Sequence, residues 1–381
     1  MKTYLLLAVI TLFMLLTSCS GTDNNNKATT DNNNHMILYA KADCFMPPKQ
    51  PECSEHFHNL YLQIHTPQLK ENRKNPVIVW LYDNTEAIPD RDVIVVTVNY
   101  RKNIQGFLDL SAFGEKYAKS GNVGLLDLIA ALTWIKNNIY KYGGDSSNVT
   151  IAGQSDSATE VLALTGMPIA DGLFHKVIIQ SASPQRIMYA MYSRRIGAAV
   201  VEELGLNSSQ IDQMKDISNE CLLYAGEKAM NRIKEESLKN SPNTNLFDWS
   251  PTVDGNLLPT HPFEVKTFRR SFNVPMLIGG FRNEFMTSRQ LAAYKSAQQD
   301  APVYMYLLDS ISTIAELSSN VSNAWLSFVR NGEPEAEGVL SWPAYQPETG
   351  AVMVFNETSE IKYNMDEAIQ TIINEKLNLD N

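Results

Sequence analysis

The feature that most constrains the fold is a series of short apolar runs separated by longer stretches with helical periodicity. Runs rich in β-branched residues occur at 77–81, 93–98, 149–152, 177–179, 276–278 and 303–307. None alternates with polar residues, as expected for strands that are covered on both faces. Between the second and third runs, apolar residues recur at helical spacing over 125–140. This alternation predicts an α/β fold, with a mostly parallel twisted sheet and helices on both faces.

Residues 186–240 show mostly helical patterns and predict a helical insertion in this fold. After the polar N-terminal segment no second polar linker occurs, and no period indicates repeats. We therefore expect one large α/β domain over residues 41–375.

The N-terminus has the pattern of an export signal. Lys2 precedes an apolar run over 4–16, which ends in Leu16-Thr17-Ser18-Cys19. The run is too short for a comfortable transmembrane span. Its ending resembles a bacterial lipobox, which predicts a signal peptide over 1–18 and lipidation of Cys19; the alternative is ordinary secretion with an unmodified Cys19. Ser20 after Cys19 is compatible with the outer membrane, so we expect an exported lipoprotein of the cell envelope, at the outer membrane or the cell surface.

The residues after Cys19 cannot bury enough apolar surface to fold. Residues 20–34 are rich in Asn, Asp and Thr. We therefore expect a polar disordered tether over residues 19–40.

The balance of charge excludes two classes of partner. The formal net charge is −10, and no cluster of Lys and Arg interrupts it. Nucleic acids and anionic lipid surfaces are therefore unsuitable partners, and the lipid on Cys19 is the predicted membrane contact.

Cysteine and histidine usage indicates a disulfide and no metal site. Cys44 and Cys53 enclose a short Pro-rich loop, which in an exported protein predicts a disulfide. Cys221 is expected to be a small buried apolar residue. His56 and His58 lie two residues apart beside Cys53 and Glu55, but no convincing further ligand is present. We predict neither a bound metal nor a cofactor.

A candidate nucleophile follows the third apolar run. Gly153-Gln154-Ser155-Asp156-Ser157 comes after this run and precedes a helical pattern. Small residues on both sides allow a sharp turn that would expose the Ser155 hydroxyl at a helix N-terminus. Alternatively, Ser157 and Glu160 fit a capping box, which would only start the helix.

Several short segments along the chain together form a recognisable pattern. They are Gly121-Asn122-Val123-Gly124-Leu125-Leu126-Asp127, Tyr142-Gly143-Gly144-Asp145, Asn148-Val149-Thr150-Ile151, Gly172-Leu173-Phe174, Gln180-Ser181, Leu60-Tyr61-Leu62 with Thr66-Pro67, Val253-Asp254-Gly255, and Trp325 through Trp342-Pro343-Ala344-Tyr345. With these segments the chain resembles the type-B carboxylesterase and cholinesterase-like family, whose members have the α/β-hydrolase fold. The resemblance runs from about residue 53 to about residue 356, in a chain shorter than a typical member. It implies a serine nucleophile at Ser155 and an acid at Glu284, which ends the segment Gly279-Gly280-Phe281-Arg282-Asn283-Glu284.

The base that the family uses is missing. The resemblance places a histidine between the strand at 303–307 and the helix at 324–329, where this chain has Asp309-Ser310-Ile311-Ser312. The six histidines are His35, His56, His58, His65, His175 and His261. A triad rebuilt with His175 or His261 remains an alternative, since geometry and not sequence distance decides it.

The oxyanion site is also altered. The family has His-Gly-Gly after the strand at 77–81, but this chain has Tyr82-Asp83-Asn84. The remaining expected donor is the backbone amide of Asp156. We expect the Asp156 carboxylate to lie against the oxyanion position and to raise the barrier by like-charge repulsion.

Three interpretations follow from these departures. In the first, ester hydrolysis by the serine nucleophile is impaired or lost, and the protein binds a small ester or a protein at the cell surface. In the second, it is a weak or rearranged carboxylesterase that uses Ser155. In the third, it is a decaying gene product whose shortened sheet folds poorly.

Overall fold

The computed structural model describes residues 34–49, 58–66, 73–81, 92–240, 247–262, 273–309, 314–335, 341–356 and 359–365. The chain divides into two units, Met1–Thr30 and Asp31–Asn381, and all described residues belong to the second.

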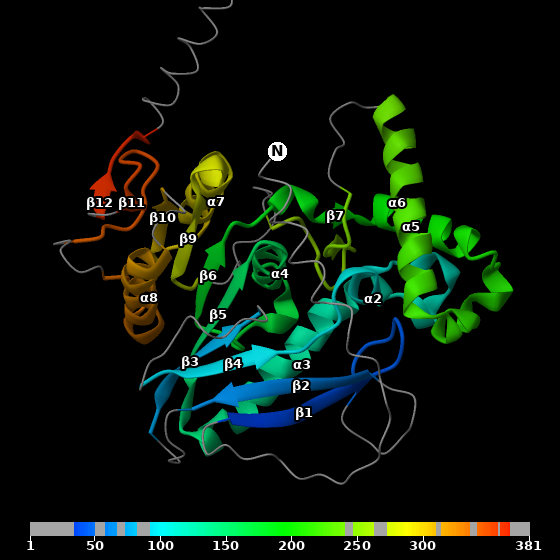
Figure 1. The fold of residues 1–381 in the computed structure, drawn as a ribbon, viewed down its shortest axis with the longest axis horizontal. Coiled ribbons are helices and arrows are strands. Elements are labelled where there is room, and N and C mark those ends of the chain that lie inside the picture. Colours follow the sequence, from blue (N-terminus) through cyan, green and yellow to red (C-terminus); the bar gives the residue numbers. More distant parts are fainter. Residues whose placement is uncertain are drawn as a thin grey trace, which may run out of the picture. The chain divides into compact units, whose positions relative to one another are not determined.

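A mixed sheet forms the centre of this unit (Figure 1). Its strand order is β1-β2-β4-β3-β5-β6-β9-β10-β11-β12. The strands from β4 to β11 are parallel, whereas β1, β2 and β12 add antiparallel edges. The bounds are β1 Asn34–Ala42, β2 His58–His65, β3 Asn75–Trp80, β4 Ile94–Val98, β5 Gly144–Gln154, β6 Lys176–Gln180, β9 Met276–Phe281, β10 Val303–Leu308, β11 Val352–Phe355 and β12 Glu360–Lys362. A second sheet pairs β7 Met188–Tyr189 with β8 Thr252–Val253.

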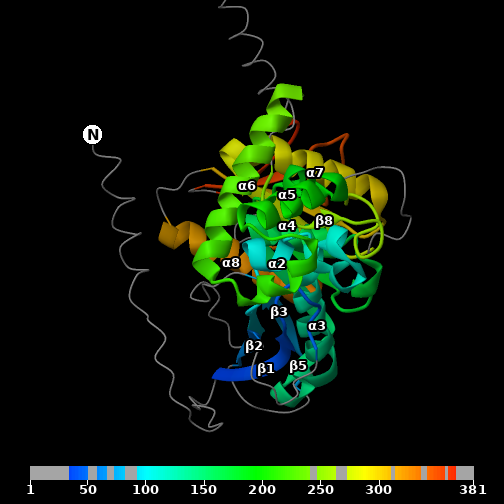
Figure 2. The ribbon, with the colours of Figure 1, turned by 90° about the vertical axis from the view of Figure 1, so that its right-hand side faces the viewer.

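Helices lie on both faces of the large sheet, with α3 and α8 on opposite sides in Figure 2. The α-helices are α2 Asn103–Phe107, α3 Val123–Asn138, α4 Asp156–Leu164, α5 Ala190–Glu203, α6 Asn219–Asn240, α7 Phe285–Gln298 and α8 Ile314–Asn331. The 3₁₀ turns are η1 Ser111–Phe113, η2 Glu115–Tyr117, η3 Ser120–Asn122, η4 Ile139–Tyr142, η5 Pro168–Ala170, η6 Pro184–Arg186, η7 Ser208–Asp216 and η8 Arg282–Glu284.

Alternating strand residues bury two separate cores. Val77 and Val79 of β3 belong to the core that also contains residues of α3, α4 and α7, whereas Ile78 between them belongs to the core that contains residues of α8. Successive side chains of a strand point to opposite faces, so a strand buried on both sides must be apolar throughout. The structure therefore confirms the predicted α/β fold, and each of the six predicted runs lies in or overlaps a strand.

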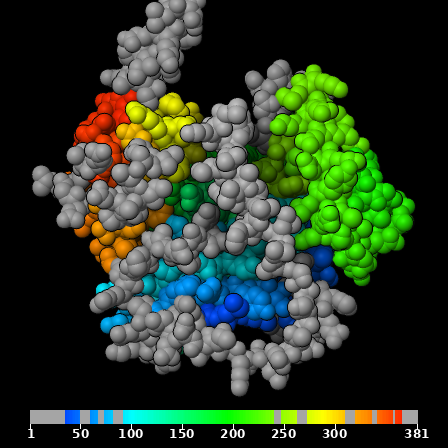
Figure 3. Space-filling model, in the orientation of Figure 1, coloured from blue at the N-terminus to red at the C-terminus, as the bar shows by residue number. Residues whose placement is uncertain are grey.

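The predicted helical insertion at 186–240 is present as α5, η7 and α6, which have a core of their own. It forms the green region at the right of Figure 3. Cys221 on α6 is exposed, so its predicted burial is wrong. The buried stripe of α6 follows Leu222, Ala225, Ala229 and Ile233, and Cys221 lies one residue off that stripe.

The sheet begins inside the segment predicted as a tether. Strand β1 starts at Asn34 and pairs with β2 along its length, with Tyr39 and Ala40 buried. The predicted tether over 19–40 therefore extends too far, because residues 34–40 belong to the edge of the sheet. The predicted signal peptide, the predicted lipidation site Cys19 and residues 366–381 lie outside the described residues.

A buried ion pair joins the segment between β4 and α2 to α3. Arg101 and Asp127, the last residue of the Gly121–Asp127 signature, lie 2.6 Å apart with side chains 3% and 0% exposed. Asn122 of the same signature donates to the Thr252 carbonyl and the Asp254 carboxylate, at 2.8 and 3.1 Å. Both signature residues therefore connect distant segments of the fold.

A lysine without a carboxylate partner is buried between α7 and the end of α4. Lys295 is 1% exposed, and its Nζ donates to Thr165 Oγ1 at 3.4 Å. Among the described residues it makes no ion pair. Burial lowers the pKa of Lys295 to about 8. When Lys295 is protonated, its charge has lost its hydration without gaining a carboxylate partner, and this lowers the free energy of unfolding.

We predict that Lys295→Met stabilises the protein near neutral pH by about 1–3 kcal/mol. Between about pH 8 and 10.5 the unfolded chain binds more protons at this lysine than the folded chain, so wild-type stability rises with pH there. The advantage of the variant should thus shrink over that range. Urea unfolding of both proteins near neutral pH and near pH 10 measures it; a constant difference would contradict the burial of a charged lysine.

Candidate functional site

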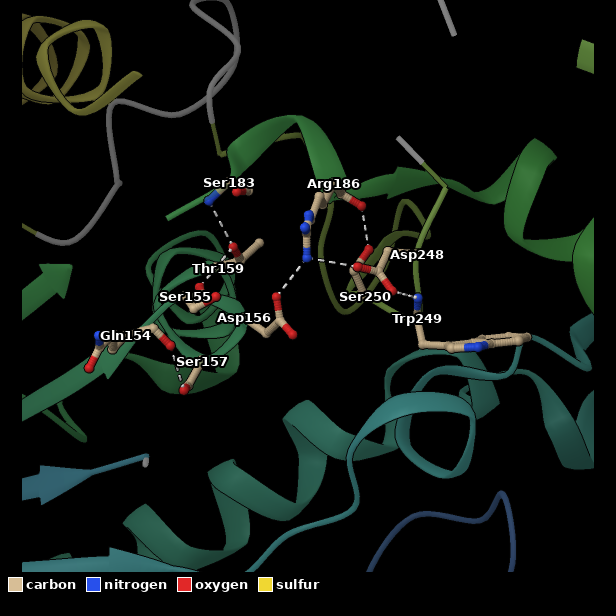
Figure 4. Close-up of polar contacts among 10 residues, drawn as sticks. All are labelled: Gln154, Ser155, Asp156, Ser157, Thr159, Ser183, Arg186, Asp248, Trp249 and Ser250. Carbon is tan, nitrogen blue, oxygen red and sulfur yellow. Dashed lines mark hydrogen bonds and ion pairs between the residues drawn. The ribbon is translucent and has the colours of Figure 1, made fainter. Parts of the chain in front are cut away.

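Ser155 occupies a strained turn between β5 and α4. Its backbone has φ 57° and ψ −118°, a conformation that costs a non-glycine residue about 1–3 kcal/mol. The Ser155 amide donates to the Gln180 carbonyl at 3.0 Å, and the Ser155 carbonyl accepts from the Thr159 amide at 3.2 Å. The side chain is exposed at the N-terminus of α4 (Figure 4). The predicted strand, sharp turn and helix are therefore present.

Close packing around Gly153 explains the tightness of this turn. A Cβ atom at Gly153 would lie 2.5 Å from the carbonyl of Ser157. Ser157 itself donates to the Gln154 carbonyl at 3.0 Å. The N-cap of α4 is Ser155 and not Ser157, so the capping-box interpretation of Ser157 and Glu160 is wrong.

No histidine reaches the Ser155 hydroxyl among the described residues. Ser155 Oγ makes no hydrogen bond there. His175 lies directly before β6, at the end of this strand that is opposite to Ser155. Its Nδ1 accepts a hydrogen bond from the Val149 amide. His261 Nε2 donates to the Pro184 carbonyl at 3.1 Å. The structure therefore brings neither candidate of the rebuilt triad to Ser155.

Glu284 lies at the same edge of the sheet as Ser155. It ends η8, directly after β9, and Ser155 directly follows β5; only β6 separates these two parallel strands. Glu284 Oε2 accepts from the Phe281 amide at 3.1 Å. Burial, with a smaller contribution from the charge of Glu284, raises the pKa of Tyr306 well above its usual range. The predicted nucleophile and acid positions thus share one edge.

The carboxylate of Asp156 is directed toward Arg186 (Figure 4). Arg186 Nη1 lies 2.7 Å from Asp156 Oδ1 and 2.8 Å from Asp248 Oδ2. The hydroxyl of Ser250 donates to the Arg186 carbonyl, which fixes the same segment. The Asp156 charge is therefore partly balanced, a feature that the sequence prediction did not anticipate. The Asp156 amide remains the first N–H of α4, which has no partner inside the helix.

Several predicted features fall outside the described residues. These are Cys53, His56 and the residues Tyr82, Asp83 and Asn84 that replace the glycine loop. The thiol of Cys44 is half-buried, and burial raises its pKa; its predicted disulfide with Cys53 stays a prediction. Within the described ranges, no group of three or more His, Cys, Asp or Glu side chains could hold a metal. Nor is any helix of those ranges long and apolar enough to cross a bilayer.

The sequence analysis considered Glu160 only as a capping residue and missed its burial beneath the turn. Glu160 is 5% exposed and accepts a hydrogen bond from the Tyr100 hydroxyl. Burial raises the pKa of Glu160 to about 7, and the nearby Asp156 charge adds to the rise. A glutamate within the apolar run Ala158–Leu164 was a usable signal, but Tyr100 lies 60 residues away in the chain.

Comparisons with known proteins agree with this geometry. The model of the Carboxylesterase family matches residues 27–306. The para-nitrobenzyl esterase of Bacillus subtilis is 29% identical over 422 residues, which cover 84% of this chain and 82% of that protein. Human cocaine esterase is 35% identical over 243 residues, but the match covers 59% of this chain and 40% of that protein.

Solved structures give the same result. A PNB esterase superposes with a TM-score of 0.75 at 27% identity, covering 90% of this chain and 97% of that chain. A carboxylesterase of Geobacillus stearothermophilus gives a TM-score of 0.73 at 25% identity, covering 89% and 96%. The fold is therefore that of the α/β-hydrolase esterases, and the chain belongs to the carboxylesterase family.

We predict that Glu160→Gln changes how stability depends on pH. The folded-state pKa of Glu160 is raised from 4.5 to about 7, so the folded protein holds this proton more tightly than the unfolded chain. Wild-type stability attributable to Glu160 is therefore lost as pH rises through this window, by up to about 3 kcal/mol. The glutamine variant should match wild type near pH 4.5 and exceed it near pH 8 in urea unfolding; parallel curves would refute the assignment.

Proposed function

We propose that this carboxylesterase-family protein has lost autonomous ester hydrolysis and binds a ligand at the edge of the sheet that carries Ser155. The observation that supports this proposal is the isolation of the Ser155 hydroxyl, which has no hydrogen-bond partner among the described residues. A serine hydroxyl is a weak nucleophile until a neighbouring base accepts its proton.

The sequence supports the same proposal. The last histidine of the 381-residue chain is His261, and Glu284 therefore has no later imidazole to orient. Removing one member of such a triad lowers the rate by several orders of magnitude. The ligand of the retained edge would be a small ester or a protein at the cell surface.

A weak or rearranged esterase is the second candidate, and the retained strain at Ser155 favours it. A backbone with φ 57° persists only where the surrounding contacts enforce it, and such strain concentrates at functional sites. This candidate requires an acceptor for the Ser155 proton from outside the described residues.

Labelling with a fluorophosphonate probe separates the two candidates. We expect the purified protein to show no more labelling than its Ser155→Ala variant, because an unactivated hydroxyl displaces fluoride too slowly. The measurement is in-gel fluorescence followed by peptide mapping. Probe attached to Ser155, together with turnover of a nitrophenyl ester that Ser155→Ala lacks, would establish the weak esterase instead.

The proposal also places the protein in the cell envelope as a lipoprotein. Its support is the sequence Leu16-Thr17-Ser18-Cys19 at the end of an apolar run, followed by a polar stretch. A single acyl chain holds a protein only marginally at a membrane, so stable anchoring requires more than one chain on Cys19.

We expect metabolic incorporation of an alkyne-labelled fatty acid into the wild-type protein and none into Cys19→Ala. Cys221→Ala is the matched control, because it removes an exposed cysteine on α6 and leaves the N-terminus unchanged. Incorporation that survives Cys19→Ala, or is lost in Cys221→Ala, would refute the assignment of the lipid to Cys19.

A further inference from the structure

A small polar cavity lies where helix α5 of the insertion meets the segment between α2 and α3. Its volume is about 160 Å³, below the roughly 300–1,000 Å³ of sites for drug-sized ligands. Apart from Ala118 and Gly121, the residues that line it carry polar or charged side chains. These are Asp109, Ser111, Asn122, Arg194, Thr252, Asp254 and Asn256. The cavity therefore suits a ligand that is small and strongly polar.

Both carboxylates of the cavity are held by neutral donors. Asp109, which is 4% exposed, accepts from the Ser111 amide at 2.9 Å and from the Ser193 hydroxyl at 2.7 Å. Asp254 Oδ1 accepts from two backbone amides, at 2.8 and 3.0 Å. Neither aspartate forms an ion pair with a described residue. Buried charges are normally paired, so a carboxylate as buried as that of Asp109 indicates a place for a cationic group.

The opposite charge comes from α5. Arg194 is exposed, and its Nε donates to Ser111 Oγ at 3.0 Å. Its guanidinium forms no ion pair with Asp109 or Asp254, although all three residues line the same cavity. The guanidinium therefore keeps N–H groups that an anionic group can accept from. The cavity thus has a positive wall and a negative wall that do not neutralise each other directly.

A buried hydroxyl in the lining also lacks a partner. Thr252 on β8 is 1% exposed, and its Oγ1 makes no hydrogen bond to any described residue. Its backbone is fixed, because the amide donates to Asn122 Oδ1 at 2.9 Å and the carbonyl accepts from Asn122 Nδ2 at 2.8 Å. Buried hydroxyls are normally hydrogen-bonded. Thr252 therefore supports a polar ligand independently of the three charges.

The two walls select the class of ligand. A divalent cation would be repelled by Arg194, and within the described ranges no group of three or more His, Cys, Asp or Glu side chains could hold one. An inorganic anion would be repelled by the two carboxylates. A neutral polyol would leave all three charges without a counter-charge. A zwitterion satisfies both walls at once, and small α-amino acids carry an ammonium and a carboxylate on neighbouring carbon atoms.

We propose that this cavity binds a small free α-amino acid. Its ammonium is held by the carboxylates of Asp109 and Asp254, and its carboxylate accepts from the Arg194 guanidinium. The Thr252 hydroxyl is a further partner. The inference goes beyond the proposed function and is independent of it, because the site uses neither Ser155 nor Glu284.

The experiment is isothermal titration of the purified protein with glycine, L-alanine and L-serine. We expect saturable binding of at least one of them to the wild type. Binding should be at least about tenfold weaker in Arg194→Gln, because the charged donor to the ligand carboxylate is lost. Arg195→Gln is the matched control and should leave the affinity unchanged. Arg195 is the next residue of α5 and pairs with Glu236 at 3.1 Å.

A second variant and two truncated ligands test the other contacts. Thr252→Val keeps the shape of the side chain but removes the hydroxyl, so it should also weaken binding. Propionate and ethylamine are L-alanine without its ammonium and without its carboxylate, and each should bind at least about tenfold more weakly than L-alanine. Thermal unfolding of each variant confirms that it is folded before affinities are compared.

Four outcomes would overturn the inference. Ethylamine or Ca²⁺ bound as tightly as the amino acids, with no effect of Arg194→Gln, would show a cation site. Glycerol bound as tightly would show a polyol site. No saturable binding of the three amino acids up to about 10 mM, which detects even millimolar affinity, would show a cavity that holds water only. Equal losses in Arg194→Gln and Arg195→Gln would show an effect of net charge.

These outcomes leave the proposed function untouched. Loss of hydrolysis is tested by fluorophosphonate labelling of Ser155, and amino-acid binding is tested by titration of variants on α5 and β8. Labelling of Ser155 would therefore overturn the first proposal and leave the amino-acid site standing.

Discussion

The backbone of Ser155, held at φ 57° and ψ −118°, is the constraint on which the functional edge of this protein depends. It is imposed by contacts on both sides: Gly153 lies against the Ser157 carbonyl, and the Ser155 amide binds the end of β6. Neither contact involves catalysis. The turn is therefore part of the packing of α4 on the sheet, which explains how its shape is held although no described histidine reaches Ser155.

The parallel order β5-β6-β9 determines what else this edge contains. Because these strands run in the same direction, the residues that follow each of them meet at one end of the sheet. Ser155, Ser181 and Glu284 are brought to one edge in this way, although Ser155 and Glu284 lie more than 120 residues apart in the chain. A base would have to enter from another connection. The edge thus holds both the predicted nucleophile position and the predicted acid position.

Much of the fold followed from the sequence, because a strand buried on both faces must be apolar throughout. The runs at 149–152 and 276–278 located β5 and β9, and with them Ser155 and Glu284. Strand β1 was not predicted, since its residues are partly polar and continue a polar segment. The contacts of Asp156 with Arg186 and of Glu160 with Tyr100 could not be predicted, because they join residues 30 and 60 positions apart whose proximity only the folded chain creates.

The shared guanidinium of Arg186 has a consequence for the electrostatics of Ser155. The side chain of Asp156 is 70% exposed, and exposed ion pairs of this kind contribute about 1 kcal/mol or less. At an ionic strength of about 1 M the screening length falls to about 3 Å, comparable with the pair itself. In a saline medium the carboxylate would be released to rotate above the turn. The local field at the serine would thus vary with the ionic strength of the medium, although no backbone atom need move.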